Sequence, residues 1–159
     1  MYILTQPSMF LCLFIGNWVE LNGIEYMVQG ITPSLQKTYE EALVHCENEG
    51  GKLAEPKSAD ANNEIATLAN NSLSDSLIGV WIGIDDKSQE GYFRYASDDT
   101  SITYTDWDTT QPDNGIWYNG NLEEDCVKLI KWSGVNRFKW SDALCSKKSS
   151  FVCERIKGK

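Results

Sequence analysis

Oxygen-bearing side chains gather in three short segments in the second half of the chain. Gln111-Pro112-Asp113 offers an amide and a carboxylate two residues apart, Glu124-Asp125-Cys126 offers two acids, and Trp140-Ser141-Asp142 supplies a further acid. Calcium takes about six to eight oxygen ligands from carboxylates, carbonyls and water, and it tolerates irregular geometry. These residue types and their grouping predict a single site for a hard divalent cation.

The acidic residues are concentrated around these segments. The formal net charge is −9, and residues 85–125 hold eleven acids against two basic residues. An acidic surface repels phosphate backbones, so we expect no nucleic acid partner. A cluster of carboxylates is usually only a solvated face. The Gln-Pro-Asp and Glu-Asp-Cys patterns that flank this cluster favour cation binding instead.

The sequence gives little reason to expect a catalytic function. A nucleophile needs a positioned base, and His45 is the only histidine of the chain. Glycoside hydrolysis by two carboxyl groups requires one of them to stay protonated in an apolar pocket, and nothing in the acidic segment marks such a residue. We therefore expect a binding protein without catalytic residues, and not an enzyme.

The cysteines indicate disulfides and an oxidising compartment. Cys46, Cys126, Cys145 and Cys153 are widely spaced, and no Cys-x-x-Cys pair suggests zinc or redox chemistry. Disulfides are the better interpretation, and they imply a secreted or extracellular protein. Five cysteines leave one over, and Cys12 is the natural unpaired residue because it lies in an apolar run.

Residues 1–16 contain an apolar run with the length of a signal-peptide core, too short to span a bilayer as a helix. No Lys or Arg precedes the run, and no clear small-x-small cleavage site follows it. Three interpretations stay open: a signal peptide, an irregular segment from a truncated or misassigned N-terminus, and a buried first strand. The N-glycosylation sequon Asn70-Asn71-Ser72 is consistent with secretion.

The elements that must position the oxygen donors can be predicted from pattern. Residues 18–21 and 24–27 flank Asn22-Gly23, which predicts a hairpin with a type I′ turn. A capping box opens a helix over residues 38–50, which carries a cysteine on its buried face. A second helix starts at Ser58 and fades into the sequon.

Short strands are predicted around a long irregular segment. Val80–Ile84 reads as a central strand, whereas residues 85–123 show little periodicity and are acidic. Long irregular segments inside one domain are more often functional than merely connecting. Three strands follow, over Cys126–Ile130, Phe138–Trp140 and Ser150–Glu154. The order of elements predicts one α+β domain.

Placed in order, these features strongly resemble the C-type lectin-like domain, from about Asn17 to Glu154, and we take residues 17–156 as that domain. The resemblance implies a fold with two helices, two small antiparallel sheets and a long irregular loop that holds calcium and ligand. It also implies disulfides between Cys46 and Cys153 and between Cys126 and Cys145. The motifs that carry it are the helix ending in Cys46, Trp81-Ile82-Gly83-Ile84, Gln111-Pro112-Asp113, Glu124-Asp125-Cys126, Trp140-Ser141-Asp142, Cys145 and Phe151-Val152-Cys153-Glu154.

The resemblance also assigns the oxygen donors to a calcium ion. Matched position by position, the ligands of one Ca²⁺ are Gln111, Asp113, Glu124 and Asp142, and a cis peptide bond before the proline would aim both flanking side chains at the ion. Ser141 stands where calcium-binding relatives usually have Asn. Serine is shorter and a weaker ligand, which leaves one coordination position to water or, alternatively, a vestigial site.

Two further sets of residues follow from the resemblance. An auxiliary calcium site would use Asp86, Glu90, Asn114 and Asp125. Bound calcium in this family accepts two vicinal sugar hydroxyls, and members with Gln-Pro-Asp tend to select galactose or N-acetylgalactosamine. The implied sugar contacts are Gln111, Asp113, Glu124, Asp142 and, by stacking, Trp117, with Tyr118 second; the alternative is that Trp117 only anchors its own loop.

The sequence therefore predicts a secreted, calcium-dependent lectin that recognises galactose-type glycans on glycoproteins or cell surfaces, as in innate immune recognition. Single sites of this kind bind weakly, so an oligomer would raise avidity. Two alternatives use the same fold: a calcium-independent protein-binding module, supported by Ser141, and a mineral- or ice-binding protein, for which the acidic loop is a weak argument.

Overall fold

The computed structural model describes residues 17–73, 78–115, 122–132 and 137–158. The predictions for residues 1–16, and for Trp117 and Tyr118, fall outside these ranges and stay predictions. Within the described ranges, no helix has the length and apolar character that crossing a bilayer would require.

The chain begins with the predicted hairpin. Strands β1 (Val19–Leu21) and β2 (Ile24–Gln29) pair antiparallel. Between them Asn22 and Gly23 have φ values of 52° and 85°. Positive φ at both central residues is the signature of a type I′ turn, whose twist matches that of the flanking strands.

Both helices begin at the predicted caps. In α1 (Tyr39–Asn48) the Glu41 N–H donates to Thr38 Oγ1 at 3.3 Å, and the Thr38 N–H donates to Glu41 Oε2 at 2.9 Å. In α2 (Ala59–Ser72) the Ser58 hydroxyl accepts a hydrogen bond from the third residue of the helix. Each cap satisfies backbone donors that have no partner inside the helix.

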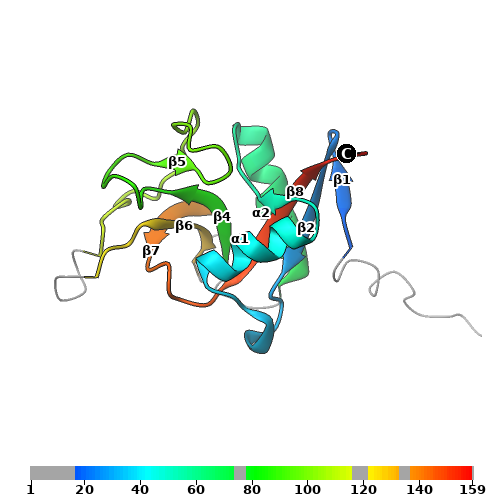
Figure 1. The fold of residues 1–159 in the computed structure, drawn as a ribbon, viewed down its shortest axis with the longest axis horizontal. Coiled ribbons are helices and arrows are strands. Elements are labelled where there is room, and N and C mark those ends of the chain that lie inside the picture. Colours follow the sequence, from blue (N-terminus) through cyan, green and yellow to red (C-terminus); the bar gives the residue numbers. More distant parts are fainter. Residues whose placement is uncertain (1–16, 74–77, 116–121, 133–136, 159) are drawn as a thin grey trace, which may run out of the picture.

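The strands form one mixed sheet in the order β1-β2-β8-β4-β6-β7, with β3 beside β8 and β5 beside β4 (Figure 1). Two antiparallel groups are joined by a short parallel pairing of Val80 and Trp81 with Ser150 and Phe151. The predicted α+β class with two helices is confirmed, and its two small antiparallel sheets meet at this pairing. The remaining elements are the 3₁₀ helix η1 (Pro33–Leu35), β3 (Lys52–Leu53), β4 (Ile78–Asp85), β5 (Arg94–Tyr95), β6 (Cys126–Lys131), β7 (Lys139–Ala143) and β8 (Ser150–Ile156).

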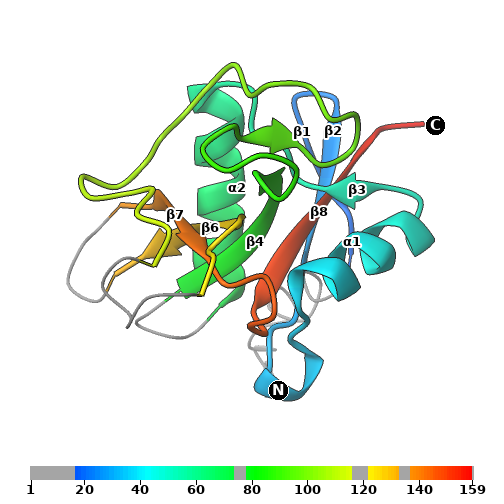
Figure 2. The ribbon, with the colours of Figure 1, turned by 60° about the vertical axis from the view of Figure 1, so that its left-hand side comes forward.

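The two helices lie against different faces of the sheet (Figure 2). Val80, Ile82 and Ile84 of β4 pack in one cluster with α2, whereas Trp81 packs in a second cluster with α1. Successive side chains of a strand point to opposite faces, so this alternation gives the domain a core on each side. Trp81 is fully buried, as expected of a core residue.

The structure contains both disulfides that the resemblance implies. Cys46 is bonded to Cys153, which ties α1 to β8, and Cys126 is bonded to Cys145, which ties the start of β6 to the segment after β7. The bonds close loops of 107 and 19 residues. In the chain-entropy account such crosslinks stabilise the fold by about 3 to 5 kcal/mol each.

A glutamate whose side chain is 12% exposed, Glu154, lies where β3 meets β8. Glu154 Oε2 accepts a hydrogen bond from the Glu55 N–H at 3.1 Å, and its other oxygen is 3.5 Å from Lys52 Nζ. Burial raises the pKa of Glu154 to about 7, against the opposing effects of that N–H and of Lys52. The ionised carboxylate is therefore costly inside this part of the fold.

We expect Glu154→Gln to stabilise the protein at alkaline pH. The pKa of Glu154 is higher in the folded protein than in the unfolded chain, so its protonated form favours folding more than its ionised form does. This contribution to stability is lost as the pH rises from about 4.5 through about 7. Relative to wild type, the variant should gain on the order of 2 kcal/mol between about pH 5 and pH 8 in urea unfolding. Parallel pH profiles for the two proteins, or the same gain in the control Glu47→Gln on the exposed side of α1, would contradict this prediction.

Candidate metal and ligand site

A fully buried tryptophan places the long loop beside β7. The Trp140 N–H donates to Asp106 O at 2.8 Å, and the Asp108 N–H donates to Trp140 O at 2.9 Å. The ring of Trp107 meets the ring of Trp140 edge-to-face at 5.5 Å. The loop therefore runs along β7, which brings the Gln-Pro-Asp segment to the strand residue Ser141 and its neighbour.

Three carboxylates meet at this place. Asp113, Glu124 and Asp142 each have a carboxylate oxygen within 4.8 Å of the other two. The first comes from the long loop, the second from the segment that enters β6 and the third from β7. β7 continues past the predicted end of its strand, so Asp142 lies on regular structure and is only 3% exposed.

A turn in the loop holds these acids in place. Asp142 Oδ2 accepts the Asp113 and Asn114 N–H groups at 3.0 and 2.7 Å. Asn114 Oδ1 in turn accepts the Glu124 N–H at 2.7 Å. Asn114 and Gly115 have φ values of 47° and 65°, and a Cβ on Gly115 would lie 2.9 Å from the Leu122 carbonyl oxygen. Glycine is therefore required where the two loop segments approach each other.

The amide of the Gln-Pro-Asp segment is bound to β7. The Gln111–Pro112 peptide is cis, the geometry suggested by the resemblance. Ser141 is 8% exposed, and its hydroxyl lies 3.0 Å from both Gln111 Oε1 and the Asp142 carbonyl oxygen, to either of which it can donate. Gln111 and Ser141 thus lie next to the three carboxylates and contact each other directly.

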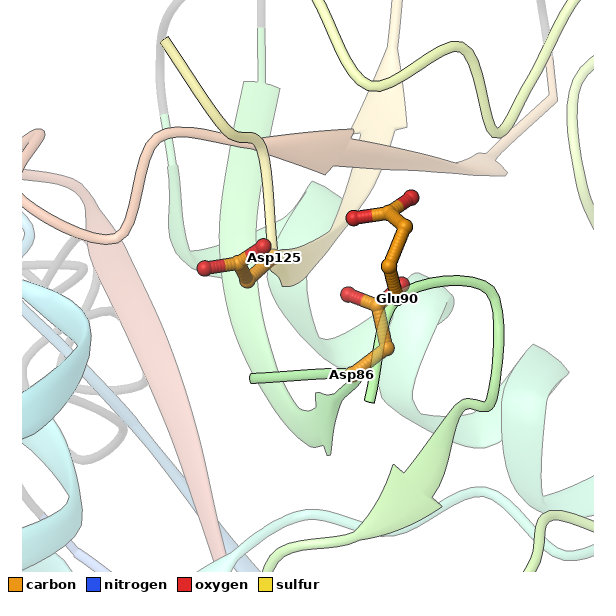
Figure 3. A group of neighbouring side chains, drawn as sticks. All are labelled: Asp86, Glu90 and Asp125. Carbon is orange, nitrogen blue, oxygen red and sulfur yellow. The ribbon is translucent and has the colours of Figure 1, made fainter. Parts of the chain in front are cut away.

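A second acidic group lies beside the first. Asp86, Glu90 and Asp125 also offer oxygens within 4.8 Å of one another, from the loop after β4 and the segment that enters β6 (Figure 3). Asp86 is 2% exposed, and its Oδ2 accepts the Gly91 N–H at 2.8 Å. Within the described part of the chain, Asp86 Oδ1 is buried without a hydrogen-bond partner. A bound cation would satisfy such a buried carboxylate oxygen.

Burial and mutual repulsion disfavour the charged forms of Asp86, Glu124 and Asp142. Burial and the nearby charges of Glu90, Asp125 and Asp142 together raise the pKa of Asp86 to about 6, against the lowering effect of the Gly91 N–H. The pKa of Glu124 is raised by burial and then by Asp142 and Asp113. Burial also raises the pKa of Asp142, against the hydrogen bonds that it accepts. A divalent cation would relieve this repulsion, so the residues present fit a metal ion.

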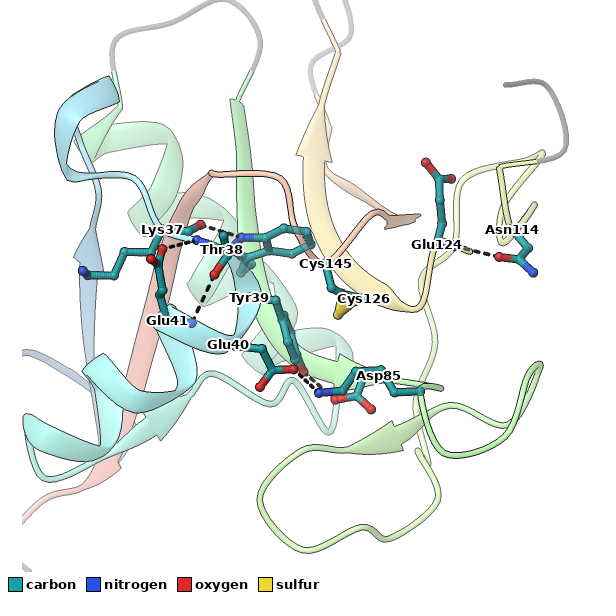
Figure 4. Close-up of a disulfide and its surroundings, with 12 residues drawn as sticks. Lys37, Thr38, Tyr39, Glu40, Glu41, Asp85, Asn114, Glu124, Cys126 and Cys145 are labelled. Atoms are coloured by element: carbon teal, nitrogen blue, oxygen red, sulfur yellow. Dashed lines mark hydrogen bonds and ion pairs between the residues drawn. A yellow bond between two sulfur atoms is a disulfide. The ribbon is translucent and has the colours of Figure 1, made fainter. Parts of the chain in front are cut away.

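The disulfide at the start of β6 supports both acidic groups. Figure 4 shows Cys126 bonded to Cys145, close to Glu124 and its hydrogen bond with Asn114. Asp125 lies between Glu124 and Cys126, and its carbonyl oxygen accepts the Asp86 N–H at 3.0 Å. Residues 124–126 therefore contribute one carboxylate to each of the two acidic groups, directly beside the disulfide.

The structure brings most of the predicted ligands together and adds one residue role. Gln111, Asp113, Glu124 and Asp142 meet at one place, whereas Trp117 lies outside the described residues. Asn114, expected in the auxiliary group, bonds to Glu124 of the first group. This contact was not predicted from the sequence, although the Asn-Gly dipeptide at this position is a turn signal.

The chain is similar to one family of protein domains and to several curated proteins. The model of the lectin C-type domain matches residues 35–155. The chain is 36% identical to the alpha-N-acetylgalactosamine-specific lectin of Patiria pectinifera, over 86% of this chain and 77% of that protein. It is 34% identical to Collectin-10 of Gallus gallus, over 77% of this chain, and spans 39% of that longer protein.

Solved structures share the fold. The human scavenger receptor C-type lectin carbohydrate-recognition domain matches with a TM-score of 0.71 and 25% identity, over 88% of this chain and 96% of that chain. A calcium-independent type II antifreeze protein matches with a TM-score of 0.66 over 87% of this chain and 91% of that chain. At 22% identity, the second match bears on the fold alone.

We expect Asp142→Ala to loosen the turn at Asp113 and Asn114 without unfolding the domain. Each backbone bond to a charged acceptor contributes about 1.5 to 3 kcal/mol, so amide exchange at both residues should become at least about tenfold faster in metal-free buffer. Glu123→Ala, which removes an exposed acid next to the site, is the matched control. Unchanged exchange at these two amides would show that Asp142 does not hold the turn.

Proposed function

The chain belongs to the lectin C-type domain family, and we propose that it binds carbohydrate through a calcium ion held by Gln111, Asp113, Glu124 and Asp142. The observation that carries the proposal is the convergence of three carboxylates from separate segments within 4.8 Å. The raised pKa values of Glu124 and Asp142 and the hydrogen-bonded turn at Asp113 support it, because such a site is arranged for a positive partner.

The side chains of the site have distinct roles in this proposal. When bound, a calcium ion supplies coordination positions for two vicinal hydroxyls of a sugar. The carboxylates of Glu124 and Asp142 would bind the ion with their negative charge. Their remaining lone pairs would accept hydrogen bonds from the sugar hydroxyls. The Gln111 amide oxygen accepts a hydrogen bond from the Ser141 hydroxyl. The amide nitrogen of Gln111 therefore stays free to donate a hydrogen bond to a sugar hydroxyl.

We propose galactose or N-acetylgalactosamine as the sugar class. The Gln111-Pro112-Asp113 order supports this choice through the family resemblance, and the similarity to an alpha-N-acetylgalactosamine-specific lectin agrees with it. Trp117 is our candidate for stacking on the apolar face of the sugar, a contact expected to contribute about 1 kcal/mol by analogy with aromatic pairs.

We propose a second calcium site at Asp86, Glu90 and Asp125, with Asn114 as a further predicted ligand. The buried and unpartnered Asp86 Oδ1 supports it among the described residues. A cation there would fix the loop after β4 against the segment that carries Glu124 into β6. This site would therefore help to position the sugar-binding one.

The protein that carries this site is, in our proposal, secreted. Two disulfides support an oxidising compartment. Residues 17–156 would form the recognition domain, preceded by a signal peptide or irregular segment over 1–16. The partners would be galactose-type glycans on glycoproteins or cell surfaces, met with the avidity of an oligomer, in a role such as innate immune recognition.

A calcium-independent module on the same fold is the second candidate. The observation that favours it is Ser141, which is buried and occupies a lone pair of Gln111 Oε1. If the Ser141 hydroxyl keeps its hydrogen bond to Gln111 Oε1, that oxygen has one lone pair fewer for an ion. The loop is then positioned by contacts within the protein. The same surface would then bind a protein partner without metal.

We expect Glu124→Gln to abolish calcium-dependent retention on galactose resin. The variant removes one negative charge from the ion while keeping the shape of the side chain, and affinity should fall at least about tenfold, or about 1.4 kcal/mol. Glu123→Gln, the exposed neighbour, should bind like wild type. Retention of wild type that survives a chelator would favour the second candidate and contradict the first.

We expect the double variant Gln111→Glu with Asp113→Asn to shift preference towards mannose. The exchange reverses which side of the ion offers the amide and which offers the acid, and so favours a different pair of hydroxyls. A change of roughly tenfold in the ratio of mannose to galactose binding, about 1.4 kcal/mol, should be visible on a glycan array. An unchanged ratio would remove the specificity assignment and leave the calcium site untouched.

A further inference from the structure

The chain contains one Asn-x-Ser/Thr sequon, Asn70-Asn71-Ser72, and it forms the last three residues of α2. Asn70 is exposed on the helix, so its side-chain amide is accessible in the folded domain. Its Oδ1 accepts a hydrogen bond from Lys131 Nζ at 2.7 Å, which holds the amide towards the end of β6.

Asn70 lies on the rim of a groove of about 570 Å³ between α2 and the start of β7. Asn63, Thr67 and Asn70 line one side, and they share a face of α2 because they are four and three residues apart. Tyr104 and Phe138, both half-buried, line the other side. Asp106, Arg137 and Lys139 line that side as well, so the groove offers polar groups on both walls together with two aromatic rings, a combination that suits a saccharide.

We propose that Asn70 is an N-glycosylation site and that the first sugars of its glycan lie along this groove. The transfer replaces one hydrogen of Nδ2: the amide nitrogen forms a bond to C1 of a lipid-diphosphate-linked oligosaccharide. The bond between C1 and the diphosphate oxygen breaks, the lipid diphosphate leaves with the electron pair, and the displaced proton goes to a base of the transferase. Oδ1 is not altered, so the Lys131 contact persists in the glycoprotein.

The position of the sequon keeps such a glycan away from the proposed calcium site. Lys131 ends β6, whereas Glu124 precedes that strand, whose six residues span roughly 20 Å. Likewise Lys139, which lines the groove, begins β7, and Asp142 lies towards its other end. Modification at Asn70 and sugar binding at the acidic loop are therefore compatible.

This inference rests on the secretion that we propose and not on calcium binding. Both disulfides require an oxidising compartment, and in eukaryotic cells that compartment also holds the transferase. The enzyme acts on the chain as it enters that compartment, so the helical state of the sequon in the folded domain does not block transfer.

The test is secretion of the full chain from eukaryotic cells behind a heterologous cleavable signal, followed by mass spectrometry before and after peptide N-glycosidase. We expect a loss of mass and conversion of Asn70 to Asp. Asn70→Gln and Ser72→Ala should each abolish the modification, whereas Asn71→Gln, the matched control, should keep it. Secreted wild type with both disulfides formed and unmodified Asn70 would overturn the proposal.

The placement of the glycan has its own readout. Glycosylated wild type should melt about 2 to 4 °C above the enzymatically deglycosylated protein, because sugars packed on Tyr104 and Phe138 stabilise the folded state. Equal melting temperatures would overturn the groove placement. Galactose-resin binding by Asn70→Gln reports on the calcium site alone, so failure of either proposal can be told from failure of the other.

Discussion

The position of Trp140 is the constraint on which the rest of the candidate site depends. Its indole N–H donates to Asn62 Oδ1 of α2 at 2.8 Å, its ring packs against Tyr104 and Trp107, and its backbone pairs with the loop on both sides of Trp107. A long loop without regular structure would otherwise lose much conformational entropy to reach a defined place. One buried side chain and two backbone bonds fix it instead. The residues that follow Trp140 on β7 are then opposite Gln111 and Asp113.

The acids of the site are held close together against their own repulsion. Covalent and hydrogen-bonded restraints make this arrangement stable: the disulfide at Cys126, the turn that donates to Asp142, and the Asn114 bond to Glu124. The raised pKa of Asp86, about 6, is the sign of the cost, since burial and neighbouring negative charges disfavour its charged form. A fold that served only its own stability would gain by neutralising such a group. A buried acid with a raised pKa at a loop edge therefore supports the proposed cation site.

Much of this structure could be predicted from local patterns. Thr38 and Ser58 mark their helices because a hydroxyl at the N-cap has a defined backbone partner, and Asn22-Gly23 marks its turn because both residues tolerate positive φ. The two-residue strands β3 and β5 were missed, since two residues carry no periodicity. The parallel pairing of β4 with β8 was also missed, because it joins residues about seventy positions apart and no local pattern records it.

The site was predictable in its residue types and not in its internal bonds. The family pattern placed the acids and the amide, but Ser141 could be judged from sequence only as a short and weak ligand. In the structure its hydroxyl reaches Gln111 Oε1 and so holds the amide that would otherwise need the ion to orient it. An amide oxygen has two lone pairs, and one of them remains for a ligand. Ser141 therefore weakens the site by one donor and preorganises it through Gln111, and these effects act in opposite directions on affinity.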